Sequence, residues 1–300
     1  KLIIPKLVIN EENRMNTVQF LGALELGLLY ALVTLGVYLT FRAINFPDLT
    51  VDGTFPLGAA VAASLIVKDV HPVLATLVAV FAGGLAGFIT GYLHVRWKIL
   101  GLLAGILTMT ALYSINLRIM GKPNIALLSE PTLFTFIKGT HANLLTIATI
   151  VIATVFLLYA FLASQFGLAL RATGINPKVS PSYGINVGLM TLVGLALSNA
   201  LVAFAGALFA QAHGFADISM GTGTLITGLA SVIVGESLFH KHHIAVILIS
   251  CIVGSILYRL VIALALNAQV AGLQVSDLNL VTAALVVLAM LMPHPLKNKR

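Results

Sequence analysis

Long runs of uncharged apolar residues recur along this chain and restrict what it can fold into. Ala142–Leu170 and Val187–His213 contain no Asp, Glu, Lys or Arg. A helix needs roughly 20 mostly apolar residues to cross the hydrocarbon core of a bilayer, so each run is long enough to span it. Because lipid offers the backbone no hydrogen-bond partners, spanning segments are helices or closed barrels. The runs lack the alternation typical of barrel strands, so we expect helices.

Composition supports an all-α integral membrane protein. Only 9% of the 300 residues are charged and 59% are hydrophobic, whereas soluble domains carry about 25% charged residues. The formal net charge of +7 does not indicate nucleic-acid binding, because Lys and Arg in membrane proteins gather in cytoplasmic loops. No nucleophile and base stand in a recognisable constellation, so we expect no catalytic residues. No metal site is expected either, because a metal needs a full ligand set.

The apolar runs predict about nine crossings. The two shortest, Gly53–Val67 and Gly221–Gly235, would reach only ~22 Å at 1.5 Å per residue, less than a ~30 Å core. We therefore expect them to be partial or broken crossings, buried in the bundle and lining a cavity. The expected crossings are Met15–Phe41, Gly53–Val67, His71–Leu93, Ile99–Leu117, Ala142–Leu170, Val187–His213, Gly221–Gly235, Ile244–Leu266 and Leu278–Met292.

The crossings define one transmembrane domain, 15–292, in two inverted-topology halves. The first half covers about 15–164, a loop covers 165–186, and the second half covers about 187–292. Residues 1–14 differ in character from the rest of the chain, and Met15 opens the first apolar run, so we expect 1–14 to be a disordered or spurious extension. Residues 293–300 form a basic tail.

Basic loops set the expected orientation. The segments "FHKHH" (Phe239–His243), "HVRWK" (His94–Lys98) and the tail "KNKR" are basic, whereas 214–220 and 267–277 contain no Lys or Arg. Cytoplasmic loops carry the excess of Lys and Arg, so we place the tail in the cytoplasm and the N-terminus outside. Residues 1–14 and 118–141 also carry cations and would lie outside, against this rule.

A weak repeat interrupts the apolar pattern in both halves. "NFPDLTVDGTFPLGAA" (45–60) follows the first long run, and "GFADISMGTGTLITGLA" (214–230) follows a later one. Such repeats point to the core of a transporter, although Asp, Thr and Ser are also ordinary helix caps. Asn116 and Asn199 are polar groups within apolar helices, for which helix packing and solute contact are both open. The expected translocation pathway comprises Phe46, Asp48, Thr50, Gly53, Asn116, Asn199, Phe215, Asp217, Ser219 and Gly223, where Phe46, Asp48, Thr50 and Gly53 align with Phe215, Asp217, Ser219 and Gly223.

The repeat also predicts topology. The two long helices that precede the motifs are the first and the sixth expected crossings, and this odd offset of five inverts the second copy. We therefore expect Asp48 near the cytoplasm and Asp217 outside.

One polar loop, "RATGINPKVSPSYGIN" (171–186), joins two of the longest apolar runs. It is rich in turn residues and poor in hydrophobic bulk. Small residues there permit close docking of another protein, and a bare linker would not require Arg171 or the repeated "GIN".

This loop resembles the cytoplasmic coupling segment of ABC importer permeases of the branched-chain amino acid and ribose type. The stretches "INFPDLTVDG" and "GFADISMGTGTLITGLASVIVGESL" resemble that family's paired motifs, and the likeness runs from Met15 to Met292. The chain looks most like a poorly characterised, amino-acid-related branch. The resemblance implies a multi-pass protein of the bacterial cytoplasmic membrane whose ATPase-coupling residues are Arg171, Gly174, Asn176, Pro177, Gly184 and Asn186.

The resemblance also implies partners: cytoplasmic ATP-binding subunits, an extracytoplasmic solute-binding protein and a second permease copy or homologue. The chain has no G-x-x-x-x-G-K-[ST] loop, so ATP and Mg²⁺ are expected on the partner subunit and no cofactor on this chain. The alternative is a gradient-driven secondary transporter or channel, whose coupling would use intramembrane ionisable residues such as Glu25, Glu236 or Arg259. The resemblance favours an amino acid or a related compound as the solute, and the residues themselves leave it open among amino acids, nucleosides and sugars.

Four glycines lie on one side of the expected crossing His71–Leu93. Gly83, Gly84, Gly87 and Gly91 share a side of their helix. Small residues permit close helix packing in membranes, and we consider both a contact within the bundle and a dimer seam.

Overall fold

The computed structural model describes residues 17–135, 142–239 and 243–267, together with residues 280, 283, 284 and 287. Within these ranges six helical spans are long and apolar enough to cross a membrane. They are α1 with η2 (Thr17–Tyr38 and Leu39–Ala43), α3 (Pro72–Trp97), α4 (Gly101–Met120), α5 (Ala142–Ala163), α7 (Val187–His213) and α9 (Ile244–Asn267). The expected extension 1–14 and tail 293–300 lie outside the described residues, as does nearly all of the expected crossing 278–292.

Two shorter apolar helices match the short crossings expected from sequence. They are α2 (Val51–Ile66) and α8 (Thr224–Leu238). Helix α2 is buried along almost its whole length, as a partial crossing inside a bundle should be. The all-helical membrane fold with short helices is therefore confirmed.

The expected crossing Ala142–Leu170 has the wrong C-terminal boundary. The run Ala142–Leu170 is divided into α5, which ends at Ala163, and α6 (Gln165–Ile175). Ser164 separates them in an extended conformation, and its side chain accepts a hydrogen bond from the N–H of Gly167 as the N-cap of α6. Apolar composition continues through this cap, so hydropathy alone could not locate the break.

A π-helix, η2, continues the C-terminal end of α1, and the sequence did not predict it. Such turns are rare and are frequent at functional sites. Helix α6 packs against η2, so the loop 165–186 is in direct contact with the end of the first transmembrane helix.

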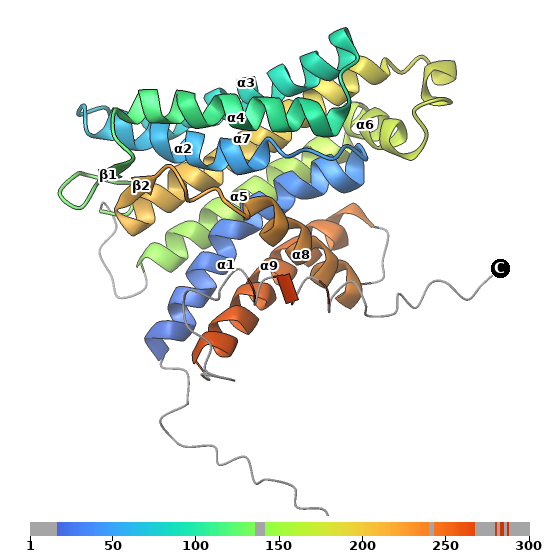
Figure 1. Cartoon of the computed structure of the whole chain (residues 1–300). Helices are drawn as coiled ribbons and strands as arrows, with labels where there is room; N and C mark the ends of the chain where they lie inside the picture. Colours follow the sequence, from blue (N-terminus) through green and yellow to red (C-terminus); the bar gives the residue numbers. More distant parts are fainter. Residues whose placement is uncertain are drawn as a thin grey trace, which may run out of the picture.

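The helices run between two ends of the bundle (Figure 1). At one end, the strands β1 (Asn124–Ala126) and β2 (Phe215–Asp217) pair antiparallel, and we call this the β end. At the other, α6 and the 3-10 turn η3 (Ser180–Tyr183) project beyond the bundle, and we call this the α6 end.

The two halves exchange their short helices. Helix α2 of the first half packs on α7 of the second, and α8 of the second half packs on α1 of the first. Helices α3 and α9 correspond in the same way, since α3 packs on α7 and α9 packs on α1. This reciprocal packing is what an inverted repeat of α1–α2–α3 and α7–α8–α9 produces, and it buries both short helices between long ones.

The glycine face of α3 packs within the chain. A Cβ at Gly87 would lie 2.2 Å from the carbonyl oxygen of Leu195 on α7, and one at Gly83 would lie 2.3 Å from the Cβ of Ala203. Gly83 and Gly87 therefore serve a close contact between α3 and α7 of one molecule.

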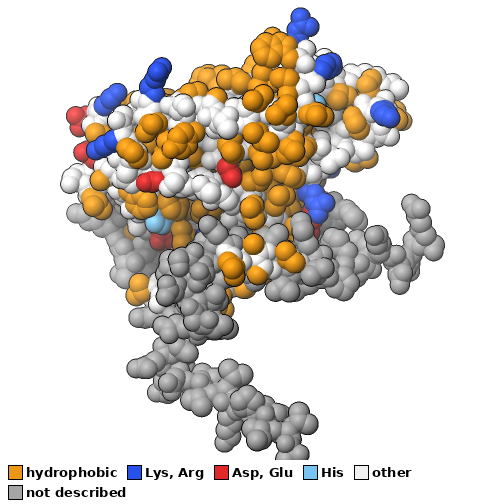
Figure 2. Space-filling model, viewed as in Figure 1, with side chains coloured by type: hydrophobic (Ala, Val, Ile, Leu, Met, Phe, Trp, Pro, Cys, Tyr) orange, Lys and Arg blue, Asp and Glu red, His pale blue; other side chains and the backbone are white. Residues whose placement is uncertain are grey.

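The outer faces of α3, α4 and α5 suit lipid. Large apolar side chains such as Phe81, Leu103 and Phe156 are exposed there. In Figure 2 the apolar surface is broad, and most Lys and Arg side chains lie toward its edges. Exposed apolar area of this extent marks a membrane-facing surface.

Candidate functional site

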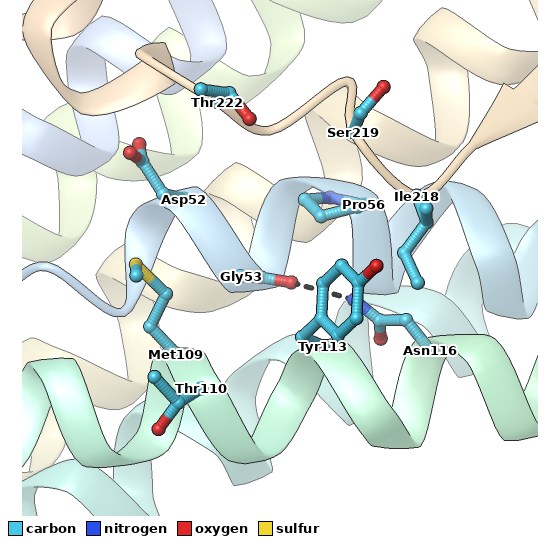
Figure 3. Close-up of a pocket in the computed structure, with 10 residues that line it drawn as sticks. All are labelled: Asp52, Gly53, Pro56, Met109, Thr110, Tyr113, Asn116, Ile218, Ser219 and Thr222. Atoms are coloured by element: carbon cyan, nitrogen blue, oxygen red, sulfur yellow. Dashed lines mark hydrogen bonds between the residues drawn. The ribbon is translucent and has the colours of Figure 1, made fainter. Parts of the chain in front are cut away.

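A pocket of about 320 Å³ lies where the first turns of α2 face α4 and the loop that precedes α8 (Figure 3). Small-molecule sites are typically clefts of roughly 300–1,000 Å³ with a few convergent polar groups. Three of the expected pathway residues, Gly53, Asn116 and Ser219, line it. The full lining is Asp52, Gly53, Pro56, Met109, Thr110, Tyr113, Asn116, Ile218, Ser219 and Thr222.

The repeat motifs have the same local geometry, which confirms the alignment at these positions. Asp48 Oδ1 accepts a hydrogen bond from the N–H of Thr50 at 2.9 Å, and Asp217 Oδ1 accepts one from the N–H of Ser219 at 2.8 Å. An Asp side chain bonded to the backbone two residues on forms an Asx turn. Each turn redirects the chain from a long helix toward a short one.

The two short helices meet through Asp52. Its Oδ1 accepts a hydrogen bond from the N–H of Leu225 at 2.7 Å, and its Oδ2 accepts one from the N–H of Gly223 at 3.3 Å. The carboxylate of the first repeat thus caps the positive N-terminal end of α8 in the second. Gly223 adopts a left-handed conformation, φ 79°, at this N-cap.

Close packing holds the α8 loop on α2. Pro56 has no N–H and cannot bond the carbonyl of Asp52 four residues earlier. Gly221 lies over that carbonyl, and a Cβ there would be 2.0 Å from the oxygen. Pro56 of the first repeat motif therefore stands where the backbone of the α8 loop crosses α2.

Asn116 fixes the opposite wall of the pocket. Its Nδ2 donates to the carbonyl oxygen of Gly53 at 3.2 Å, and the side chain is 1% exposed. Its Oδ1 is buried with no hydrogen-bond partner. A buried acceptor left unpaired is costly, so its donor has to come from a water, a ligand or a conformational change.

Three other expected pathway residues do not line this pocket. Asp48, Thr50 and Asn199 are each 0% exposed. Asn199 Nδ2 donates to Asp48 Oδ2 at 2.7 Å, the Thr54 hydroxyl donates to Asn199 Oδ1 at 2.7 Å, and the Thr50 and Thr90 hydroxyls lie 2.8 Å apart. In this conformation a closed network between the start of α2, α3 and α7 satisfies these three residues. Their place on a translocation pathway stays a prediction.

The remaining pathway residues lie near the two ends. Phe46 packs edge-on against His94 toward the α6 end, whereas Phe215 packs against Phe209 and Asp217 accepts from Asn124 at the β end. Asp48 and Asp217 therefore lie toward opposite ends of the bundle, although Asp48 is buried rather than at a surface. Hydrogen bonds from the hydroxyl and N–H of Ser219 lower the pKa of Asp217 below its ordinary value, which keeps this carboxylate charged.

The loop 165–186, in which the coupling residues are expected, forms a helix and a turn, α6 and η3. Its repeated "GIN" has a local cause, because each Asn caps the next stretch of backbone. Asn176 Oδ1 accepts from the N–H groups of Lys178 and Val179, and Asn186 Oδ1 accepts from Leu189 at the start of α7. Pro177 is exposed, and Gly184 has φ 77° with open space around it.

Two coupling residues face inward rather than outward. A Cβ at Gly174 would lie 2.1 Å from the carbonyl oxygen of Ala43 in η2. Arg171 is directed to carbonyl oxygens of its own chain, those of Gly167 and Leu162, each at 3.4 Å. A bulky residue at Gly174 would therefore disrupt the packing of α6 on η2 before it met a partner.

Sequence reasoning missed several residues of the site. Asp52 and Pro56 stand inside the quoted motif and could have been found there, whereas Met109, Thr110 and Tyr113 carry no sequence signal because only tertiary packing brings α4 to the motif. It also missed an ion pair between Arg42 of η2 and Glu236 of α8, which joins the two halves near the α6 end.

The two ends should label from opposite sides of the membrane. Asp48 is buried, so we choose Leu128, 86% exposed at the β end, and Tyr183, 80% exposed at the α6 end. In a Cys251→Ala background, Leu128→Cys should react with an impermeant maleimide in intact cells, and Tyr183→Cys only after permeabilisation. Labelling of both in intact cells would contradict the topology.

Comparisons with known proteins agree with this architecture. A family model described as branched-chain amino acid transport system / permease component matches residues 19–292. A tyrosine transport system permease protein of Clostridioides difficile is 41% identical over 261 residues, 87% of this chain and 86% of that protein. An uncharacterised protein of Rickettsia prowazekii is 36% identical over 251 residues, 82% of this chain and 88% of the relative.

A probable branched-chain amino acid transport permease protein of Methanocaldococcus jannaschii is 30% identical over 220 residues, 68% of this chain and 69% of that protein. No solved structure matches the chain. The family model takes in nearly all of the crossings expected from the sequence and reaches all six spans of the structure. The chain therefore belongs to the permease-component family of branched-chain amino acid transport systems and is a multi-pass membrane protein.

Proposed function

We propose that this chain is the translocation subunit of an ATP-driven importer and that it carries an amino acid with an apolar or aromatic side chain. Family membership supports the transport role, and a relative of 41% identity is described as a tyrosine transport permease. The small, mixed polar and apolar pocket between the two repeats suits a solute of this size.

The observation that carries the ATP-driven mechanism is the surface of the coupling loop. Ile175 is 87% exposed and Tyr183 is 80% exposed, on a loop that projects beyond the bundle at its α6 end. Their exposure on a loop that projects from the bundle supports a contact with another protein there. The cytoplasmic ATP-binding subunits would dock here and would hold ATP and Mg²⁺, while this chain binds no cofactor.

Through the contact between α6 and η2, a movement of the docked ATP-binding subunit would reach the first transmembrane helix. A shift of α6 acts directly on η2 through Gly174 and Ala43, and η2 holds Arg42 of the ion pair with Glu236. An extracytoplasmic binding protein would deliver solute at the β end, and a second permease copy or homologue would complete the membrane assembly.

Reconstitution tests the proposal. The chain is purified with the ATP-binding and solute-binding subunits encoded beside it and placed in proteoliposomes, and uptake of radiolabelled L-tyrosine and L-leucine is measured. Uptake is expected only with the binding protein outside and ATP at the nucleotide-binding face. Uptake driven by an ion gradient without ATP would replace this proposal with the secondary-transporter alternative.

A further inference from the structure

We propose that Asp52 forms a subsite for a primary ammonium group, which receives the amino group of the solute in the pocket between α2, α4 and the α8 loop. The inference rests on the proposed function, which it deepens by naming the chemistry that the permease itself recognises. It adds a charge-specific contact within the membrane subunit.

Asp52 is the one charged side chain among the ten residues that line this pocket. An ionised carboxylate offers about four lone-pair positions, and the N–H groups of Leu225 and Gly223 use one on each oxygen. Capacity therefore remains for a further donor. Because the site has a negative group and no cationic side chain in its lining, it favours a cation over an anion.

Asn116 lines the same pocket but belongs to its wall. Its amide nitrogen donates to the Gly53 carbonyl oxygen, and its Oδ1 is buried. Figure 3 shows Asn116 beyond Gly53 and Tyr113, away from the Asp52 carboxylate. The carboxylate of Asp52 is therefore the charged acceptor that would meet the donors of a primary ammonium.

The remaining wall suits an apolar body. Pro56, Met109, Tyr113 and Ile218 line the pocket beside Asp52. Figure 3 shows the Met109 side chain extending from α4 toward the turn of α2 that carries Asp52. An amino acid could thus place its ammonium at Asp52 and its side chain along this wall.

A purely structural role for Asp52, as the cap of α8, predicts a different result from a ligand-binding role. Asp52→Asn keeps an oxygen that can accept from Leu225, because an Asn side chain also caps helices well. It removes the negative charge. A cap function should survive this change, whereas selectivity for a cation should not.

Cysteine protection tests the subsite. Thr110 is exposed and lines the pocket, so Thr110→Cys in a Cys251→Ala background reports its occupancy in the assembled transporter in lipid nanodiscs. Tyramine, which carries an ammonium and no carboxylate, should slow maleimide labelling at least fivefold. 3-(4-Hydroxyphenyl)propionate, which lacks the amine, should slow it less than twofold. With Asp52→Asn, tyramine protection should fall below twofold.

A second pair of variants keeps the test decisive if Asp52→Asn does not fold. Met109→Lys places a tethered ammonium beside Asp52 and should abolish protection by tyramine, whereas Leu103→Lys, near the start of the same helix and outside the pocket lining, should preserve it. Equal protection by both probes, protection by neither, or identical behaviour of the two Lys variants would overturn the subsite.

The uptake experiment remains separate from this one. Tyramine protection in a complex that imports no amino acid would refute the proposed function and leave a cation subsite. ATP-dependent uptake of L-tyrosine without selective protection would refute the subsite alone.

Discussion

Replacing Gly87 with alanine is expected to destabilise the folded bundle more than any other single methyl addition in α3. The new Cβ would lie 2.2 Å from the carbonyl oxygen of Leu195 and 2.8 Å from the Cβ of Asn199. A backbone carbonyl cannot rotate away as a flexible side chain can, so α3 and α7 must separate. Overpacking of this kind costs roughly 1–3 kcal/mol and sometimes more, and we expect about 3 kcal/mol here because the obstacle is backbone.

The predicted loss has a wider consequence, since Asn199 belongs to the buried network with Asp48. A shift of α7 would strain that network and leave buried polar groups unpaired, which adds to the cost. The measurement is the thermal unfolding midpoint of the purified permease in detergent, with size-exclusion elution to follow aggregation. The midpoint should fall by several degrees.

Gly84 provides the matched control on the same helix. The nearest atoms to a Cβ there are the carbonyl oxygen of Ala196 and the Cβ of Ala200, both at 3.7 Å, which is ordinary contact. Gly84→Ala should leave the midpoint unchanged or raise it slightly, because alanine is the better helix former. Equal midpoints for the two variants would show that α3 and α7 are not packed as described.

A second large effect is expected at the coupling loop. Changing Ile175 and Tyr183 together to Asp should lower solute-stimulated ATP hydrolysis and uptake at least tenfold. Both side chains are mostly exposed, so the change should not alter the thermal midpoint of the permease. Two charges placed in an apolar protein interface are desolvated without a partner, which is strongly unfavourable.

Co-purification separates docking from folding. The ATP-binding subunit should no longer co-elute with the doubly substituted permease. Leu128→Asp, at an equally exposed apolar residue of the β end, should retain co-elution. Gly174→Trp is not a suitable probe, because it would disturb the packing against Ala43 before it reached a partner. Normal ATPase binding by the double variant would place the docking surface elsewhere.

Much of the architecture could be predicted because membrane helices are specified locally. Apolar length alone indicates a crossing, since lipid leaves the backbone only its own hydrogen bonds. The break at Ser164 and the π-helix η2 were missed because a cap and one wider turn leave hydropathy unchanged.

The candidate site was only partly predictable. The motif alignment of Asp48 with Asp217 identified paired Asx turns, because a turn of this kind depends on residues two positions apart. It could not distinguish the buried Asp48 from Asp52 at the pocket, since both lie in one short stretch and only long-range partners separate them. Asn199 and Asn116 looked alike in sequence, yet one is fully paired and the other retains a free acceptor.

By itself, the sequence determined the membrane class, the order of long and short helices and the presence of two related motifs, since each depends on local composition or on residues close along the chain. Tertiary structure alone decided that α8 packs on α1 and α2 on α7, that Asp52 caps α8, and that α4 closes the pocket. The reason is physical. Contacts between segments far apart along the chain depend on how helix surfaces fit, and the composition of apolar helices does not indicate which of them pack together.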